Sequence, residues 1–277
     1  MDAITKRDTR VIAQVVLATI FLCPTGVSRA QAGGAEKIEL RTEIFAVGGI
    51  HVATNRTRIE TGAGRYVITA DVKSLGIASL IVDVATHSEV SGALTSGELR
   101  PQAYRGEVHR NGTDIYNWIN YAPNGSATGA SSPSEPSPRP VPPGPIAGTI
   151  DQLTAFYQME RTFAQKKSCA LQVTVFDGLR LYKLHFSDAG SEVLKPSGGD
   201  AFAGPTQICR FEREAIAGFS DNNGRSEGIF EGKLWCARLL GNEMAIPVRV
   251  EFSTEFGSVT GELAELHAPD TDLRFGE

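Results

Sequence analysis

The sequence predicts a mainly β protein: a curved antiparallel sheet or half-barrel of the β-spiral type, with one amphipathic helix. Three observations support this fold class. Apolar and polar residues alternate along many short segments, two of these segments meet at Asp177-Gly178, and only residues 151–165 place apolar side chains at helical spacing. Sandwiches and barrels commonly run to about 200 to 250 residues, so the 277 residues suit one large β domain.

The central hairpin spans residues 168–187. An Asp-Gly pair between alternating apolar residues favours a two-residue type I′ turn, which would place Phe176 opposite Leu179 and Val173 opposite Tyr182. One face is apolar and is expected to face the core: Cys169, Leu171, Val173, Val175, Tyr182, Leu184 and Phe186. The other face mixes polar side chains with Phe176, Leu179 and Leu181. The hairpin therefore presents a core face and a partly wet face.

The first half of the chain predicts a meander of strands. Residues 37–46 alternate as a half-buried strand does, and glycine turns lead into strands over 51–60 and 65–73. A short apolar run follows at 80–84. Residues 101–110 and 114–121 then flank Asn111-Gly112, which is a further hairpin signal.

The second half predicts strands at 207–219 and 234–240 and a closing hairpin of 248–253 with 258–266. Turns are expected around 196–199 and 220–226. Residues 267–277 are polar and are expected to form a disordered tail. The β domain is therefore predicted to cover residues 33–266.

Two other segments interrupt the strand pattern. Residues 123–148 are rich in Pro and Ser, and such a composition predicts an extended, mobile linker or a long surface loop within one domain. Residues 151–165 predict a helix that Asp151 caps and that covers or plugs the sheet. The apolar stripe of this helix consists of Leu153, Phe156, Tyr157 and Phe163.

The N-terminus is typical of an export signal. A charged start ends at Arg10, an apolar run follows from Val11 to Cys23, and a small-residue exit ends at Ala32. We expect residues 1–32 to be removed as a signal peptide and the remainder to be periplasmic. The apolar run is too short for a membrane anchor, and no other stretch could span a bilayer, so no integral membrane segment is expected after cleavage.

Three cysteines remain in the predicted mature chain: Cys169, Cys209 and Cys236. An oxidising compartment favours one disulfide and one remaining thiol. Cys169 lies on the core face of the central hairpin, and Cys209 alternates in phase with Phe211, so a Cys169–Cys209 disulfide is preferred. Pairs that involve Cys236 stay open, because sequence alone does not fix connectivity.

Composition and motifs give few signs of chemistry. The formal net charge of −5 and the lack of a basic patch argue against a nucleic-acid partner. The histidines never occur at metal-ligand spacing, and neither a Cys-x-x-Cys nor a Gly-x-Ser-x-Gly motif is present. We therefore expect no metal site, no cofactor, no catalytic residues and no enzymatic activity. A hydrolase built from distant residues is the weakest alternative, with His185 as its base.

Several segments of the second half resemble the bacterial domain-of-unknown-function family 3108. They are Asp151-Gln152-Leu153-Thr154-Ala155, Val175-Phe176-Asp177-Gly178, Ala203-Gly204-Pro205, Ile208-Cys209-Arg210, Ile216-Ala217-Gly218-Phe219, Ile246-Pro247-Val248-Arg249-Val250 and Phe256-Gly257. The resemblance spans residues 36–266, and before residue 123 it rests on strand order and Leu99-Arg100-Pro101.

The resemblance implies an exported protein of Gram-negative envelopes without an assigned activity. It also implies a fold similar to the half-barrels of periplasmic lipoprotein carriers, with a helix in or beside the concave side. The family's cysteine pair matches Cys169 and Cys209. The long Pro/Ser-rich loop and Cys236 depart from the family pattern.

The expected function is that of a non-enzymatic cell-envelope protein that binds a lipid or other apolar ligand, or an envelope partner, on a concave β surface. Phe176, Leu179 and Leu181 are the expected ligand-facing residues, because they lie opposite the core face of the central hairpin. The alternative is a purely structural or interaction protein of the envelope, which a filled concave side would favour.

Overall fold

The computed structural model describes residues 36–76, 79, 83–95, 98–133, 137–195, 201–219, 231–241, 244–254 and 257–275. Residues Gly33–Glu277 form one compact unit. The predicted signal peptide and the turns around 196–199 and 220–226 lie outside the described residues, as does most of the apolar run 80–84.

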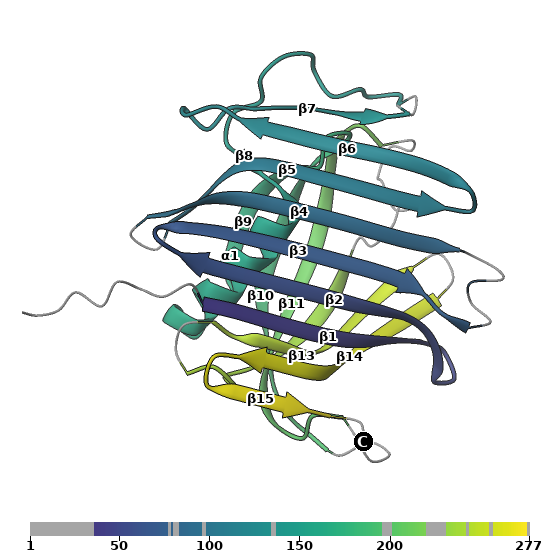
Figure 1. Ribbon diagram of the computed structural model, residues 1–277, viewed down its shortest axis with the longest axis vertical. Coiled ribbons are helices and arrows are strands. Elements are labelled where there is room, and N and C mark those ends of the chain that lie inside the picture. Colours follow the sequence, from purple (N-terminus) through teal and green to yellow (C-terminus); the bar gives the residue numbers. More distant parts are fainter. Residues whose placement is uncertain are drawn as a thin grey trace, which may run out of the picture. The chain divides into compact units, whose positions relative to one another are not determined.

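The unit is built around a single 15-stranded sheet whose order is β7-β6-β5-β4-β3-β2-β1-β14-β13-β12-β11-β10-β9-β8, with β15 paired to β14 (Figure 1). The bounds are β1 Glu36–Ala46, β2 Ile50–Gly62, β3 Arg65–Ser74, β4 Val84–Thr95, β5 Glu98–Arg110, β6 Thr113–Tyr121, β7 Ala127–Ser132, β8 Thr149–Ile150, β9 Leu171–Phe176, β10 Leu181–Leu194, β11 Gly204–Ala217, β12 Glu231–Ala237, β13 Ile246–Thr254, β14 Gly257–Ala268 and β15 Thr271–Arg274. Among the strands of the described residues, only β8 and β9 pair in parallel.

The two halves of the chain join through β1 and β14. These strands pair antiparallel from Glu39 opposite His267 to Phe45 opposite Thr260. The sheet is therefore continuous from β7 to β8. It is nearly closed and barrel-shaped, with a seam, which confirms the predicted fold class.

Helix α1 spans Gln152–Lys166, as the apolar stripe predicts. The Asp151 side chain accepts a hydrogen bond from the Thr154 amide, and Lys167 ends the helix in the left-handed conformation. The helix contacts β9 on one side and β3, β4 and β5 on the other, and Figure 1 shows it behind the long front strands. It therefore lies inside the curved sheet.

Two apolar clusters fill the space around α1. Ala155, Met159 and Phe163 pack with residues of β9–β12, whereas Tyr157 packs with residues of β2–β6. The largest members of the first cluster include Phe186, Phe211 and Phe219, and those of the second include Tyr66, Tyr104 and Ile119. The helix thus fills the concave side of the sheet with its own side chains.

The predicted turn of the central hairpin is wrong. Phe176 pairs with Leu181 and Val175 with Tyr182, so the loop holds residues 177–180 and not two residues. The Asp177 carboxylate accepts the amides of Leu179 and Arg180, and this side-chain turn competes with the type I′ geometry. The register moves by two residues, which leaves the strand residues on their predicted faces but puts Leu179 into the loop.

The Pro/Ser-rich segment also differs from a mobile linker. Ala127–Ser132 forms β7 and pairs with β6. Farther along, Ser137 Oγ donates to the Phe219 carbonyl at 2.6 Å, the Gly218 amide donates to the Arg139 carbonyl at 2.7 Å, and Ala127 bridges to Ile146. Proline removes an amide donor but leaves its neighbours' groups available, so the segment is fastened along the seam.

The predicted disordered tail is likewise wrong as far as Phe275. Strand β14 continues to Ala268, and β15 pairs with it from Glu265 opposite Arg274. The Phe275 ring then lies 5.9 Å from that of Phe202. Polar composition concealed this strand, because cross-strand charged pairs and one terminal aromatic side chain hold it. The compact unit therefore extends past the predicted limit of residue 266.

Candidate functional site

The three predicted ligand-facing residues do not line an open concave surface. Phe176 is 3 % exposed and packs in the interior, where a Cβ at Gly129 of β7 would come within 2.9 Å of its ring. Leu181 packs against the same interior cluster, and Leu179 is half-buried. The prediction placed Phe176 and Leu181 on one face of the hairpin, and this face is packed in the interior, whereas Leu179 belongs to the loop.

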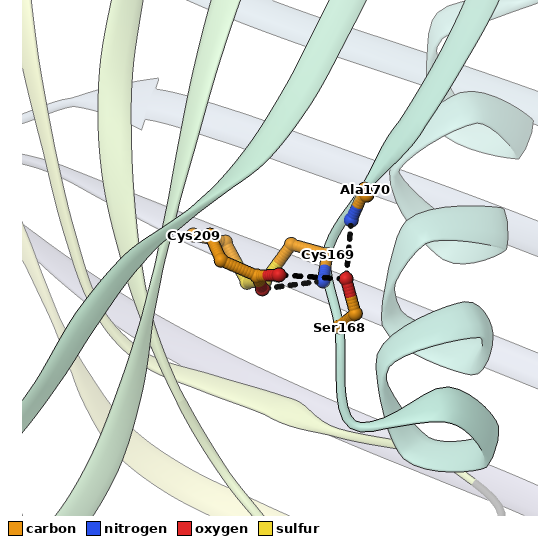
Figure 2. The surroundings of a disulfide bond; sticks show 5 residues. Ser168, Cys169, Ala170 and Cys209 are labelled. Carbon is orange, nitrogen blue, oxygen red and sulfur yellow. Dashed lines mark hydrogen bonds between the residues drawn. A yellow bond between two sulfur atoms is a disulfide. The ribbon is translucent and has the colours of Figure 1, made fainter.

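Cys169 and Cys209 form a disulfide with a Cα–Cα distance of 5.7 Å, which is the pair that the sequence favours (Figure 2). The Cys169 amide donates to Asp188 at 2.8 Å, and Asp188 pairs with Cys209 across the β10–β11 ladder. Cys236 is a buried thiol, and burial raises its pKa above the usual range. A buried neutral thiol is a poor nucleophile.

Every histidine of the chain lies beside a carboxylate at the surface. His51 contacts Glu43, His87 contacts Asp71, His109 contacts Asp114, His185 contacts Glu214 and His267 contacts Asp272. Within the described part of the chain, His185 makes no hydrogen bond to a serine, threonine or cysteine side chain. Nor do three or more His, Cys, Asp or Glu side chains gather there in a way that could hold a metal ion.

A hollow of 710 Å³ lies beside the joint between β1 and β14; we call it the β1–β14 cleft. Apolar side chains line the cleft together with side chains that are charged or carry hydroxyls. The apolar members are Phe45, Val47, Leu263, Ala264 and Phe275, and the polar members are Arg41, Glu43, Arg249, Ser258, Thr260 and Glu262. A volume of this size falls within the range of small-molecule sites.

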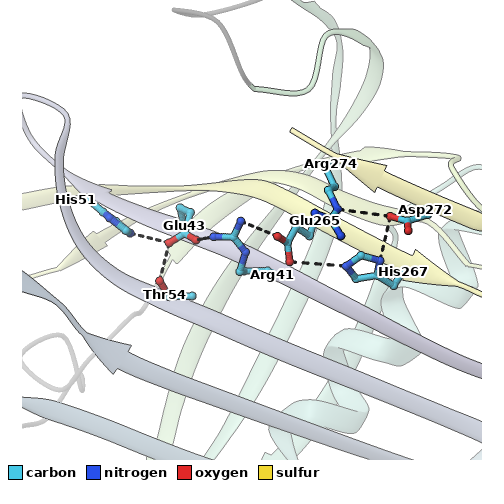
Figure 3. A network of polar contacts seen from close by, with 8 residues as sticks. All are labelled: Arg41, Glu43, His51, Thr54, Glu265, His267, Asp272 and Arg274. Atoms are coloured by element: carbon cyan, nitrogen blue, oxygen red, sulfur yellow. Dashed lines mark hydrogen bonds and ion pairs between the residues drawn. The ribbon is translucent and has the colours of Figure 1, made fainter. Parts of the chain in front are cut away.

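A network of polar contacts crosses the sheet beside this cleft (Figure 3). Arg41 pairs with Glu43 and, at 2.9 Å, with Glu265. Glu43 also accepts the Thr54 hydroxyl at 2.6 Å and lies 2.6 Å from His51 Nε2. The hydrogen bond from Arg41 is the main cause that lowers the pKa of Glu265. The alternating charges therefore hold each other in place across β2, β1 and β14.

Arg249 forms the second charged centre of the cleft. Its guanidinium lies 2.9 Å from Glu251 and 3.4 Å from Glu262, and it stacks over the Trp235 ring at 5.3 Å. The Trp235 indole donates to Glu192 at 2.8 Å. Burial raises the pKa of Glu262, and the charge of Arg249 opposes this shift. Arg249 is thus fixed by an aromatic face and two carboxylates.

The turn between β1 and β2 shapes the rim of the cleft. Gly48 and Gly49 have φ angles of +83° and +75°, which side chains with a Cβ rarely adopt. The turn places Val47 and Ile50 in solvent, at 69 % and 52 % exposure. Sequence alternation identified these strands but did not bring Arg41 and Arg249 into one cleft. The pairing of β1 with β14 was the missing information.

Among the described residues, no helix is both long and apolar enough to cross a membrane. No curated protein matches the chain. The structure is similar to a solved structure described as a "Beta-barrel-like Protein of Domain of Unknown Function DUF1849 from Brucella abortus". The TM-score is 0.51 at 10 % identity, over 85 % of this chain and 98 % of that one.

The family comparison covers most of the chain. Residues 41–264 match the model described as "Protein of unknown function (DUF3108)". This range contains every strand from β2 to β13, together with α1 and both bridged cysteines. It also contains most of the residues that line the β1–β14 cleft. The chain therefore belongs to the DUF3108 family of proteins of unknown function.

Proposed function

We propose that the protein is an exported, non-enzymatic component of the periplasm that binds a small amphipathic envelope molecule in the β1–β14 cleft. The observation that carries this proposal is the cleft itself, in which apolar and charged side chains line the same volume of 710 Å³. An acyl chain would lie against Phe45, Val47 and Phe275. Its polar head would meet the charged side chains at Arg41 and Arg249.

The charges of the cleft indicate the kind of head group. Two arginines, Arg41 and Arg249, line it together with two glutamates, Glu43 and Glu262. Each guanidinium is already paired with a carboxylate, so a singly charged anion would have to displace one of these pairs. A zwitterionic head can satisfy both signs of charge at once, and we therefore favour it over an anionic one.

The test is a titration with a fluorescent single-chain zwitterionic lipid, with a fluorescent fatty acid of the same chain length as the comparison. We expect saturable binding that is tighter for the zwitterionic probe. Val47→Asp should abolish it, because a charge would replace one of the apolar side chains that line the cleft. Val193→Asp is the matched control, since both valines are similarly exposed, at 69 % and 67 %, and Val193 does not line the cleft. Equal binding by both variants, or none by the wild type, would refute the proposal.

A second candidate is a purely structural or interaction protein of the envelope. The filling of the concave side by α1 favours it, because no ligand is needed to complete the interior. In the same titration this candidate predicts no saturable binding of either probe by a protein whose circular dichroism and unfolding transition are normal.

A further inference from the structure

The outward face of β1–β7 is charged along most of its length. One cross-strand row runs through Glu39, Arg58, Thr69, Glu89 and Arg105, and the next runs through Arg41, Arg56, Asp71, His87 and Glu107. On β6 each row reaches an aromatic residue, the first Trp118 and the second Tyr116. We call this pair of rings the β6 aromatic face.

The two rings stand in solvent without a role in the core. Tyr116 is 50 % exposed and Trp118 is 39 % exposed. Of the large hydrophobic side chains that are exposed among the described residues, these two are the aromatic ones. Ile119 of the same strand is fully buried and packs in the interior cluster. Tyr and Trp that combine a flat apolar face with a polar atom are characteristic of binding surfaces.

Strand β7 leaves the rings uncovered. Ser132 pairs with Tyr116 and Ala130 pairs with Trp118, so only small side chains lie beside them at the edge of the sheet. On the other side, Glu107 pairs with Tyr116 and Arg105 pairs with Trp118. A flat ligand can therefore lie along β6 and reach both the ring faces and the polar groups of β5.

A hollow of 340 Å³ continues from Tyr116 across β5 to β3. Its polar walls include His87 with Asp71, and His109 with Asp114, each pair 2.7 Å apart. Glu107 lies between these pairs and makes no hydrogen bond or ion pair with another described residue. The hollow is at the small end of ligand sites, and its groups can donate to and accept from hydroxyls.

We propose that the β6 aromatic face and this hollow bind a neutral glycan. The C–H face of a sugar ring is flat and weakly apolar, so it stacks on an aromatic ring, while its hydroxyls require nearby acceptors and donors. Trp118 and Tyr116 supply two successive stacking surfaces, and Glu107, His87 and His109 supply the hydroxyl partners.

The charge of the surface selects among possible occupants. Lys73 and Arg105 are roughly matched by Asp71, Glu107 and Asp114, so the face offers no excess of basic groups to a nucleic acid or an anionic membrane. A stable protein interface normally has a larger apolar centre than two rings surrounded by charged side chains. A neutral, hydroxyl-rich chain fits both the balance of charge and the narrow aromatic strip. The site shares no lining residue with the β1–β14 cleft.

Intrinsic fluorescence offers a direct test, because the chain has only two tryptophans. Trp118 is 39 % exposed and Trp235 is 5 % exposed, so an added quencher reports mainly on Trp118. We expect tetrasaccharides of β-1,4-linked N-acetylglucosamine or glucose, titrated into the mature protein, to shift the emission saturably. They should also protect it from acrylamide, and calorimetry should give the same Kd.

The variants use exposed positions, so the fold is expected to persist. Tyr116→Ala and Trp118→Ala should each weaken binding at least tenfold by calorimetry, and Glu107→Gln severalfold. Val193→Ala, a control at an exposed apolar position elsewhere, should leave the Kd unchanged. Unchanged circular dichroism verifies that each variant is folded.

Three results would overturn the proposal. The first is the absence of saturable binding for both tetrasaccharides. The second is binding that Trp118→Ala leaves intact. The third is a sedimentation experiment in which the wild type is a dimer and Trp118→Ala is a monomer, because the rings would then serve an interface between copies of the chain.

Discussion

At the scale of single residues, the N-terminus of α1 depends on one buried chain of hydrogen bonds. Thr154 Oγ1 donates to Asp151 at 2.7 Å and lies 3.0 Å from the Tyr66 hydroxyl. Since the threonine proton is directed to the carboxylate, Tyr66 is the donor in the second bond. Burial raises the pKa of Asp151, and its hydrogen bonds with Thr154 oppose this shift. The chain thus fixes the helix to β3.

Replacing Thr154 with valine tests this connection. The side chain keeps its shape, but the Asp151 carboxylate and the Tyr66 hydroxyl each lose a partner in a dry site. A buried polar group left without a partner costs about 1–3 kcal/mol, so we expect Thr154→Val to lower the free energy of unfolding by about 2–4 kcal/mol. Urea unfolding measures the change. The control is Thr128→Val at an exposed position of β7, which should change it by less than about 0.5 kcal/mol.

Glu160 is a second buried residue whose state affects the stability of the fold. It lies on the buried side of α1, and burial alone raises its pKa to about 8. No hydrogen bond to its carboxyl group is present among the described residues. The folded protein therefore holds a proton on Glu160 that the unfolded chain releases above a pH of about 4.5.

The free energy of unfolding should consequently depend on pH, because the folded and unfolded states differ in the protonation of Glu160. Between about pH 4.5 and pH 8 the folded state binds more protons than the unfolded state, so the free energy of unfolding falls as pH rises, and the effect levels off above pH 8. The shift corresponds to a loss of up to about 5 kcal/mol. Glu160→Gln removes it, so urea unfolding at pH 5 and pH 8 should differ less in the variant than in the wild type. An identical pH dependence in both would contradict this account, and the exposed Glu212→Gln is the control.

At the scale of elements, the seam between β7 and β9 depends on the segment that connects them. The Ser137 hydroxyl reaches Phe219, the Arg139 carbonyl accepts the Gly218 amide, and Ile146 bridges back to Ala127. Gly178 and Gly129 let the backbones come close at the same place, because a Cβ at either would meet backbone atoms of β6 or β7 at 3.2 Å or less. Residues 137–146 thus connect the two sides of the seam by hydrogen bonds; we call this segment the strap.

Exchanging residues 137–145 for glycine and serine of equal length should loosen the strap. The prolines restrict the unfolded chain, so their loss raises the entropy cost of ordering the segment. We expect faster hydrogen exchange at the amides of Gly218 and Ala127 and little change at those of β2 and β3. Ser137→Ala alone should give a smaller effect of the same kind. If the exchange causes no larger change in hydrogen exchange at Gly218 and Ala127 than at β2 and β3, the segment does not hold the seam.

The elements also show how far the sequence can be interpreted. Alternation located most strands, the helical stripe located α1, and in-phase alternation identified Cys169 with Cys209. The turn at Asp177 was misjudged because a side-chain carboxylate can satisfy the same amides as a tighter turn. The strand at residues 271–274 was missed because its stability comes from β14 and not from its own composition.

At the scale of the whole molecule, the sequence lacks the information that decides the site. Periodicity states which side chains share a face, but not what covers that face. Phe176, Leu179 and Leu181 were therefore expected to face a ligand, whereas Phe176 and Leu181 pack in the interior and Leu179 lies half-buried in the loop. The β1–β14 cleft arises from two strands that lie more than 200 residues apart in sequence, as in the pairing of Arg41 with Glu265. A local sequence pattern cannot predict such a pairing.

The whole molecule also offers a joint test of export and disulfide formation, because the four cysteines are distributed between the predicted signal and the compact unit. Cys23 lies in the apolar run of the signal, Cys169 and Cys209 are bridged, and Cys236 is a buried thiol. Alkylation of denatured, unreduced protein followed by mass spectrometry counts the thiols. The exported and cleaved chain should begin at Gly33 and carry one alkyl group, whereas an exported but uncleaved chain should carry two.

A chain that begins at Gly33 and stays in the reducing cytoplasm should carry three alkyl groups, because the bridge does not form there. The bridge closes a sequence separation of 40 residues, for which the chain-entropy model gives roughly 3–4 kcal/mol. The cytoplasmic form should therefore unfold at a lower urea concentration, and oxidation in vitro should restore the midpoint. Three thiols on the protein recovered from the periplasm would contradict the disulfide, and a full-length mass confined to the cytoplasm would contradict export.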